Sequence, residues 1–326
     1  CKVKNANPFI IVGQGLAGTI LAHHFLEAGI PFVIYDSPET HFTSSQAAGG
    51  IFNPVTGRKL EKTWLAEDLF PYLVDFYSRL EQTLGASFFH PMPLFRPFAN
   101  EEMKTWLMDR KETIDHAYLR WEAEGVWVEQ AGWVDVVKLL QISRLYFIEK
   151  GLLKTETYTG HEAIFCEGFH GQKNPLWSSL PFLPAKGELM EIQSDEPSED
   201  YILNKNGFIL PLGGKQFKVG ATYSWKEFTN EITSESREAL ADKLKAMGVE
   251  AYEFISQKTG IRPATQDRRP FVGFRPDGKA GIFNGFGSKG VSLSPFFAKQ
   301  WTQEILGKAE VDSEASIRRF YHLFSV

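Results

Sequence analysis

The sequence predicts an α/β fold that carries a second, α+β layer, and three observations support this class. Near the N-terminus, short apolar runs that end at a glycine or an acid alternate with a helical pattern, which is typical of a parallel sheet. A similar short strand and a long helix occur near the C-terminus. Between them, strand patterns follow one another with turn residues and no helix, which favours an antiparallel sheet.

Residues 9–35 have the pattern of one strand–helix–strand unit. Phe9–Val12 is an apolar run, residues 16–28 carry apolar positions at helical spacing, and Gly29 follows as a helix stop. Residues 32–35 form a second apolar run that ends at Asp36. The right-handed crossover rule makes these two strands parallel neighbours.

The remaining elements follow in chain order. We expect helices at 62–84, 100–110, 113–124, 134–150 and 233–247 and after residue 290, an extended segment at 88–98, and strands at 162–166, 187–193, 207–211, 216–221 and 281–284. Either Thr233 or Ser234 is expected to cap the helix at 233–247. The dinucleotide-binding domain is therefore expected to be discontinuous, at 1–62, 130–180 and 258–326, with a substrate domain at 63–129 and 181–257.

Composition narrows the functional class. The 326 residues are 43% hydrophobic and 23% charged with a net charge of −5, and the absence of a long basic run does not favour a nucleic-acid partner. Cys1 and Cys166 form neither a disulfide framework nor a metal cluster, and they favour the reducing cytoplasm. The eight histidines lack metal-ligand spacing, so no metal is expected. Neither a secretory signal nor a membrane span is recognised.

A glycine-rich loop joins the first strand to the first helix. It reads Gly13-Gln14-Gly15-Leu16-Ala17-Gly18. The first glycine permits a tight turn, the second lets the backbone approach a pyrophosphate, and the third allows close helix–strand packing. The backbone N–H groups at the start of the helix, including those of Leu16 and Ala17, are suited to phosphate, and Asp36 to ribose hydroxyls. This context predicts a Rossmann-like dinucleotide site.

A run of small residues after Asp36 favours FAD over NAD. It reads Thr43-Ser44-Ser45-Gln46-Ala47-Ala48-Gly49-Gly50-Ile51. Small residues let backbone donors approach a flat ring system, so we expect cofactor contacts from Ser44, Ser45, Gln46, Ala48, Gly49 and Gly50. Gly168, which follows the strand at 162–166, is expected at the same cofactor. Taken alone, the run is equally typical of a flexible surface loop.

Several motifs, in chain order, resemble one enzyme family. They are 132–135 (GWVD), 184–188 (PAKGE), Pro211 through 220–222 (GAT), 260–267 (GIRPATQD), 270–273 (PFVG) and 285–295 (GFGSKGVSLSP). The set resembles the D-amino-acid oxidase family of FAD-dependent oxidoreductases, which includes glycine oxidase and sarcosine oxidase. The resemblance implies oxidation of the C–N bond of an amino acid or N-substituted glycine by hydride transfer to flavin N5.

The resemblance also implies individual roles. Arg262 would hold the substrate carboxylate, for which a planar guanidinium is suited, and a structural ion pair is the alternative. The turn formed by Gly287, Ser288, Lys289 and Gly290, followed by Val291, would bring a helix N-terminus to the flavin pyrimidine edge. Lys289 would supply a cation there or a second substrate contact, with a solvated surface lysine as the alternative.

The chain departs from the family pattern in two ways. It has no cysteine around Arg262 and no histidine at 44–50, so the FAD is expected to be noncovalent. Phe208 stands where some amino-acid oxidases carry a tyrosine, and a phenyl ring cannot donate a hydrogen bond. Tyr223 is a candidate replacement, and a packing role at the rim is the alternative.

Two alternative functions remain open. The turn at 287–290 followed by Ser294-Pro295 is similar to the oxidase half of the bifunctional tRNA methylaminomethyl-thiouridine biosynthesis protein. That similarity implies oxidation of a carboxymethylaminomethyl side chain on a wobble uridine, with tRNA as the partner. The loss of the usual tyrosine leaves a non-catalytic flavin-binding protein as the alternative of another class.

Overall fold

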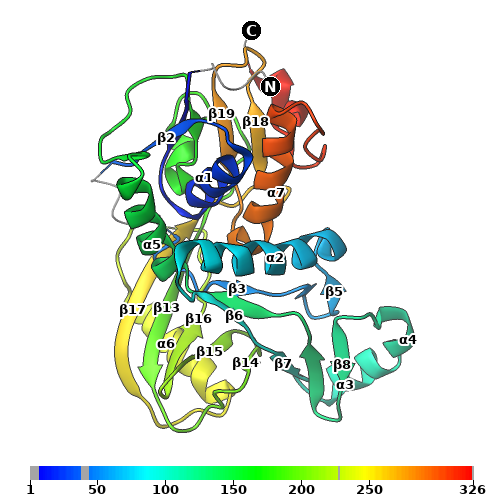
Figure 1. The fold of residues 1–326 in the computed structure, drawn as a ribbon. Helices are drawn as coiled ribbons and strands as arrows, with labels where there is room; N and C mark the ends of the chain where they lie inside the picture. The colour runs from blue at the N-terminus through cyan, green and yellow to red at the C-terminus, as the bar shows by residue number, and fades with distance from the viewer. Residues whose placement is uncertain (1–6, 38–43, 227, 325–326) are drawn as a thin grey trace.

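Two sheets organise the fold in the computed structural model, which describes residues 7–37, 44–226 and 228–324 (Figure 1). Within those residues the upper sheet has six strands in the order β11-β2-β1-β12-β19-β18. They are β11 (Leu153–Lys154), β2 (Phe32–Tyr35), β1 (Phe9–Val12), β12 (Ile164–Phe165), β19 (Gly281–Asn284) and β18 (Phe271–Phe274). The pairings are parallel except for β18 with β19.

The first strand–helix–strand unit forms as predicted. Helix α1 (Leu16–Ala28) connects β1 to β2, and these two strands are parallel neighbours. The helix ends because Gly29 adopts a left-handed conformation and its N–H bonds to the carbonyls of Phe25 and Leu26. α1 packs against α7 (Gly290–Ile305) and α5 (Val136–Glu149).

The lower sheet has eight strands among the described residues, in the order β17-β13-β16-β15-β14-β7-β9-β8. They are β17 (Glu253–Arg262), β13 (Ala185–Gln193), β16 (Gln216–Gly220), β15 (Phe208–Gly213), β14 (Ile202–Leu203), β7 (Leu94–Pro97), β9 (Gly125–Val128) and β8 (Leu119–Trp121). The antiparallel prediction is confirmed for β13, β15 and β16, while β14 pairs with β7 in parallel.

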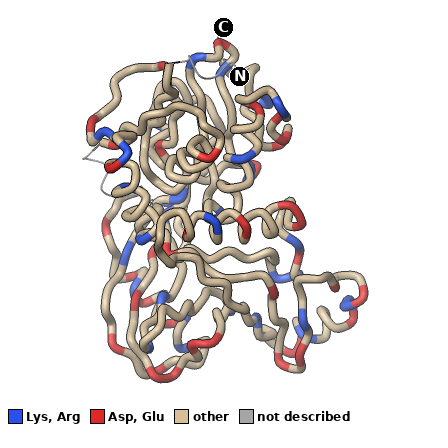
Figure 2. The backbone as a smooth tube through the Cα atoms, viewed as in Figure 1, with Lys and Arg blue, Asp and Glu red and all other residues tan. Residues whose placement is uncertain are grey.

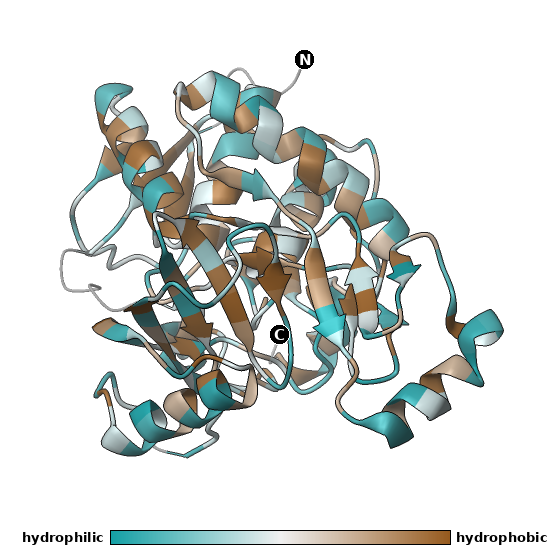
Figure 3. Cartoon of the chain, turned by 90° about the horizontal axis from the view of Figure 1, so that it is seen from below, coloured by the Kyte–Doolittle hydropathy of each residue, from teal (hydrophilic) through white to brown (hydrophobic). Residues whose placement is uncertain are grey.

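Helices cover the lower sheet on two sides. Helix α6 (Ser234–Ala246), capped by Thr233, buries Leu240 and Leu244 against one face in a hydrophobic cluster. Viewed from below, the strands are largely hydrophobic, whereas the surrounding helices alternate hydrophobic and hydrophilic stretches (Figure 3). Helix α2 (Ala66–Leu84) runs between the two sheets (Figure 1).

Short elements complete the described chain. A three-stranded sheet contains β3 (Ile51–Phe52), β10 (Gly132–Val134) and β6 (Phe89–Pro91), and a two-stranded sheet contains β4 (Val55–Thr56) and β5 (Glu61–Lys62). The other helices are α3 (Glu101–Met108), α4 (Lys111–Ile114) and the 3-10 helices at Gly168–Lys173 and Ile317–Leu323. None of the helices in the described part of the chain is long and apolar enough to cross a membrane. Cys1 and Thr43 lie outside the described residues.

One predicted helix is wrong. Residues 113–124 contain only the end of the short helix α4, followed by strand β8. In β8 the exposed Arg120 lies between two partly buried neighbours, which is the two-residue alternation of a strand. Pairing with β9 supplies the backbone hydrogen bonds that a helix would otherwise provide. Strand β17 was not predicted, and the proposed domain boundaries stay a prediction.

Two adjacent histidines lie buried in α1. His23 Nε2 lies 2.9 Å from Ser143 Oγ. His24 Nδ1 lies 2.8 Å from Ile20 O, and His24 Nε2 lies 2.8 Å from Tyr72 Oη. Desolvation lowers the pKa of His23 to about 3 and that of His24 to about 4. Both rings are therefore neutral packing residues at neutral pH.

We expect this pair to make the fold sensitive to mild acid. Both native pKa values lie below the usual 6.5, so between pH 6.5 and 4 the unfolded chain binds protons that the folded protein does not. The free energy of unfolding is therefore highest above pH 6.5 and decreases as the pH falls toward 4. Between pH 7 and 5 the loss is about 2 kcal/mol per histidine. Urea unfolding at pH 7 and pH 5 measures the loss in free energy of unfolding. In His23→Gln that loss should be smaller by about this amount. His161→Gln, at an exposed histidine, should keep the wild-type difference; equal losses in all three proteins would contradict this account.

Candidate functional site

The glycine-rich loop leaves no room for a side chain at its first and third glycines. Gly13 has φ of 98°, and a Cβ there would lie 2.8 Å from the carbonyl oxygen of Cys166. A Cβ at Gly18 would overlap the carbonyl oxygen of Gly13. Gly15, the N-cap of α1, provides no side-chain cap, so the N–H groups that open the helix face the loop. A turn of this kind can cradle a pyrophosphate.

Asp36 lies beside the same loop and has two partners. Its Oδ1 accepts a hydrogen bond from the Gln14 backbone N–H at 2.9 Å, and its Oδ2 pairs with Arg144 Nη1 at 2.7 Å. Arg144 Nη1 also donates to Gln14 Oε1 at 2.7 Å. Arg144 comes from α5, more than a hundred residues after Asp36, so no local motif pointed to it.

The small-residue run bridges the glycine-rich loop and the lower sheet. Ser45 Oγ accepts a hydrogen bond from the Leu16 N–H at 3.1 Å, at the start of α1. A Cβ at Gly260 would lie 3.0 Å from Ser44 Cα, and one at Gly49 would lie 2.9 Å from the Phe208 ring. The described part of the run is therefore packed between two layers and is not a detached loop.

Other residues of the expected cofactor site are distributed around this bridge. Gly50 is buried, and a Cβ there would overlap the Val134 carbonyl oxygen. Gly168 follows β12, and its carbonyl accepts a hydrogen bond from Asn284 at 2.9 Å. Ala17 and Ala48 are partly buried, and Gln46 is exposed.

The turn before α7 reaches both layers. The Gly287 N–H donates to Pro263 O at 3.1 Å, directly after Arg262 in the chain. At the other end of the turn, a Cβ at Gly290 would lie 3.2 Å from Leu16 Cδ2. The N-termini of α1 and α7 therefore converge, and each adds partial positive charge. Ser288 is exposed and Val291 is buried.

Lys289 lies at the start of α7 and is partly buried. Its Nζ donates to Thr63 Oγ1 at 3.3 Å. Burial lowers the pKa of Lys289, and the nearby cations Arg268 and Arg269 lower it further. Lys289 is thus held inside the fold, unlike the solvated surface lysine that was the alternative.

Arg262 and Tyr223 meet on one face of the lower sheet. The Arg262 guanidinium lies over Gly187, where any Cβ would overlap it, and 4.8 Å from the Tyr223 ring centroid. Its Nη1 makes one long hydrogen bond, 3.5 Å, to Lys186 O. Burial lowers the pKa of Arg262, with Tyr223 acting in the opposite direction. Among the described residues, no carboxylate lies within ion-pair distance of this guanidinium.

The structure thus brings the predicted residues into two adjoining groups. The first surrounds the glycine-rich loop, with Ser45, Asp36 and the start of α7. The second contains Arg262 and Tyr223 over the lower sheet. Gly49 and the 263–264 segment connect them. No cluster of three or more His, Cys, Asp or Glu side chains that could hold a metal ion is found in the described ranges.

The glycine-rich turn between β1 and α1, with Asp36 at the end of β2, is typical of a dinucleotide-binding fold. Sequence comparison identifies the family: the profile described as DAO, FAD dependent oxidoreductase, matches residues 9–304. The chain belongs to this family, and it is an enzyme whose cofactor is FAD. The glycine positions, the open start of α1 and the carboxylate of Asp36 fit the pyrophosphate and ribose of that cofactor.

Curated relatives are similar over different shares of the chain. The tRNA 5-methylaminomethyl-2-thiouridine biosynthesis bifunctional protein MnmC of Marinobacter nauticus is 22% identical over 361 residues, covering 92% of this chain and 55% of that protein. Glycine oxidase of Geobacillus kaustophilus is 29% identical over 123 residues, covering 36% of this chain and 32% of that enzyme. The chain spans about half the length of the MnmC proteins it matches.

Solved structures share the fold over almost the whole chain. Iminodiacetate oxidase from Chelativorans sp. BNC1 superposes with a TM-score of 0.74 at 18% identity, covering 94% of this chain and 98% of that one. Glycine oxidase from Geobacillus kaustophilus gives a TM-score of 0.76 at 18% identity, covering 94% and 97%. The mixed α/β architecture is therefore that of the family.

We expect Arg144 to contribute to FAD affinity. Its ion pair orients the Asp36 carboxylate while leaving lone pairs for ribose hydroxyls. Arg144→Ala should weaken FAD binding about five- to tenfold, equivalent to about 1 kcal/mol. Fluorescence titration of the apoprotein with FAD measures this constant. Lys138→Ala, at an exposed site on the same helix, should leave it unchanged, and tighter binding by the Arg144 variant would reverse the assignment.

Proposed function

We propose that this enzyme oxidises the C–N bond of an amino acid or an N-substituted glycine, with bound FAD supplying the hydride acceptor at its N5 atom. The observation that carries the proposal is the Arg262 guanidinium, which is partly buried and has no carboxylate partner among the described residues. A charged group withdrawn from solvent is costly without a counter-ion, so a substrate carboxylate is the natural partner.

Gly187 and Tyr223 would set the plane of the guanidinium. Gly187 forms a floor without a side chain, and the Tyr223 ring lies beside the cation. A carboxylate could then accept two parallel hydrogen bonds from the open side of Arg262. Tyr223 also supplies a hydroxyl donor that Phe208 lacks. Holding the carboxylate at two points would fix the amine-bearing carbon for transfer of its hydride.

Lys289 and the start of α7 would form the positive end of the site. Lys289 is held against Thr63, and the backbone N–H groups that open α7 lack a side-chain cap. Cationic and N–H groups placed in advance stabilise negative charge that develops during the reaction without further reorganisation. We assign these groups to the pyrimidine edge of the cofactor.

Noncovalent attachment of FAD is part of the proposal. Cys166 packs beneath the glycine-rich loop, and burial raises the pKa of its thiol, which opposes formation of a nucleophilic thiolate. No cysteine or histidine occurs in the described part of the small-residue run or beside Arg262 in the sequence.

A second candidate is oxidation of a carboxymethylaminomethyl group on a tRNA wobble uridine. The MnmC similarity over 92% of the chain favours it. So do the aromatic rings beside Arg262: the Tyr223 ring contacts the guanidinium, and the ring centroids of Tyr223 and Trp225 are 4.8 Å apart. Aromatic rings can stack on unpaired bases. Figure 2 shows positive and negative residues interspersed along the chain, so phosphate attraction would be weak.

Arg262→Ala should separate substrate binding from cofactor binding. We expect KM for an amine-carboxylate substrate to rise about 100-fold, because a charge-assisted bidentate contact is lost, while FAD content stays at the wild-type level. Arg262→Lys keeps the charge without the planar fork and should give an intermediate KM. Anaerobic flavin bleaching with glycine, sarcosine, proline and D-amino acids identifies the substrate. An absence of bleaching by any amine-carboxylate would remove this function.

The tRNA reaction requires a separate measurement. If it is the physiological reaction, tRNA from a deletion strain should accumulate the carboxymethylaminomethyl form at the wobble uridine, and purified enzyme should convert it. Mass analysis of the nucleosides before and after incubation measures both changes. Arg262→Ala protein should fail to convert the same tRNA. An unchanged nucleoside profile in the deletion strain would contradict a role in tRNA oxidation.

A further inference from the structure

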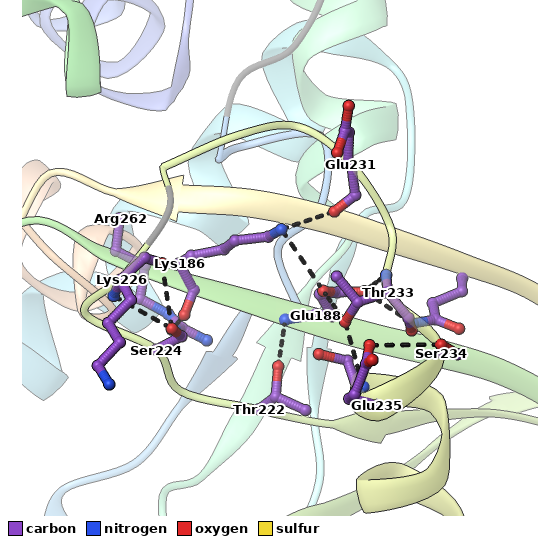
Figure 4. Close-up of polar contacts among 12 residues, drawn as sticks. Lys186, Glu188, Thr222, Ser224, Lys226, Glu231, Thr233, Ser234, Glu235 and Arg262 are labelled. Atoms are coloured by element: carbon purple, nitrogen blue, oxygen red, sulfur yellow. Dashed lines mark hydrogen bonds and ion pairs between the residues drawn. The ribbon is translucent and has the colours of Figure 1, made fainter.

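Two charged side chains are buried on the face of the lower sheet opposite Arg262. Lys186 and Glu188 of β13 are 5% and 1% exposed. Figure 4 shows the side chain of Lys186 reaching toward Glu231. Alternate residues of a strand point to opposite faces, so Gly187 lies under the Arg262 guanidinium while its two neighbours point away. The reaction proposed above uses neither side chain.

These two side chains hold the chain at 231–233. Glu188 accepts hydrogen bonds from Gln257 Nε2 at 2.7 Å, from the Thr233 N–H at 3.3 Å and from Thr233 Oγ1 at 3.2 Å (Figure 4). Lys186 Nζ donates to Glu231 O at 2.6 Å and lies 3.7 Å from Glu188 Oε1. Thr233 also caps α6, so this contact fixes where the helix begins.

The backbone of the same residues holds the chain at 222–224. Lys186 and Ser224 exchange two backbone hydrogen bonds of 2.9 Å. The Thr222 N–H donates to Glu188 O at 3.1 Å, and the Glu188 N–H donates to Thr222 Oγ1 at 2.9 Å. This pairing places Tyr223 opposite Gly187, on the face that carries Arg262.

The chain therefore leaves β13 after Ser224 and is hydrogen-bonded to it again at Glu231. The segment between these points carries Trp225, which is 62% exposed and packs on Tyr223, and Phe228, which packs on Phe169. Tyr223 itself is 50% exposed. Because half or more of Tyr223 and Trp225 is exposed, their positions depend strongly on the points at which the chain is bound to β13.

A buried ion pair is a poor way to gain stability. Removing two charges from water costs several kcal/mol, and apolar replacements of similar volume are often as stable. Such a pair instead requires specific partners at defined distances. Here those partners all belong to the chain that returns from the Arg262 site or to the strand beside it.

We propose that Lys186 and Glu188 are positioning residues that hold Tyr223 against Arg262 and so determine how tightly the site binds a carboxylate. The proposal rests on the function assigned to Arg262. It adds a second group of residues that act on the substrate only through the 222–233 backbone.

The test uses the FAD-bound enzyme and compares two double variants. Lys186→Met with Glu188→Leu removes the buried pair and keeps apolar volume. Glu191→Gln with Lys258→Met is the matched control, because this pair also links β13 to β17, at 3.1 Å, without contacting 222–233. Hydrogen exchange of backbone amides, FAD content, kcat and KM are measured, together with the Kd of sodium acetate from the flavin absorbance change.

The buried-pair variant should exchange amides at 222–224 and 231–233 about tenfold faster, and should raise both KM and the acetate Kd about tenfold. Its FAD content should be unchanged and its kcat within about twofold. The control pair should behave as wild type, and Lys186→Arg, which keeps the donor and the charge, should retain most of the wild-type acetate binding. Unchanged exchange and unchanged acetate binding in the buried-pair variant would overturn the proposal.

Arg262→Ala distinguishes a failure of the function assigned to Arg262 from a failure of the positioning role. If it leaves acetate binding intact, the function assigned to Arg262 fails. If it abolishes acetate binding while the buried-pair variant binds normally, only the positioning role fails. Should the double variant lose FAD, Glu188→Gln is measured in the same way, because it removes one charge at constant size; a wild-type acetate Kd in that variant would count against positioning.

Discussion

The close backbone approach at the β1–α1 turn is the constraint on which the rest of the structure depends. Gly13 and Gly18 allow β1, α1 and the end of β12 to meet without intervening side chains. That contact sets the position of the first N–H groups of α1, which Ser45 then reaches from the small-residue run. The start of α7 packs against the same point. The end of β12, the small-residue run and the start of α7 therefore converge on one turn, in which neither Gly13 nor Gly18 can carry a Cβ.

How much could be predicted from the sequence depended on how local the signal was. β1, α1 and β2 were predicted because their apolar periodicity, the glycine stop and the acid lie within 30 residues. The helix at 113–124 was wrong because a three-residue strand is too short to separate a two-residue from a 3.6-residue period. β17 was missed because lysine, glutamine and glutamate on an edge strand hide the alternation.

The candidate site shows the same division. Motif spacing identified the glycine-rich loop and Asp36, the family resemblance pointed to Arg262 and Lys289, and the structure brings these residues into two adjoining groups. Arg144 could not be predicted, because its ion pair with Asp36 depends on how α5 lies against the first strands. The packing of Tyr223 against Arg262 depends on cross-strand register, which sequence alone does not specify. Their roles in binding and catalysis stay predictions.

Gly187 has a consequence for attempts to redesign this scaffold. Because the guanidinium of Arg262 rests directly on that glycine, the floor of the site tolerates no added atoms and offers no position for diversification. Trp225 and Phe228 stand at the rim, beyond Tyr223, and are 62% and 38% exposed. Libraries aimed at new amines should therefore vary the rim and leave the floor intact. Carboxylate binding at Arg262 and selection of the rest of the substrate at the rim can then be altered separately on one face of the sheet.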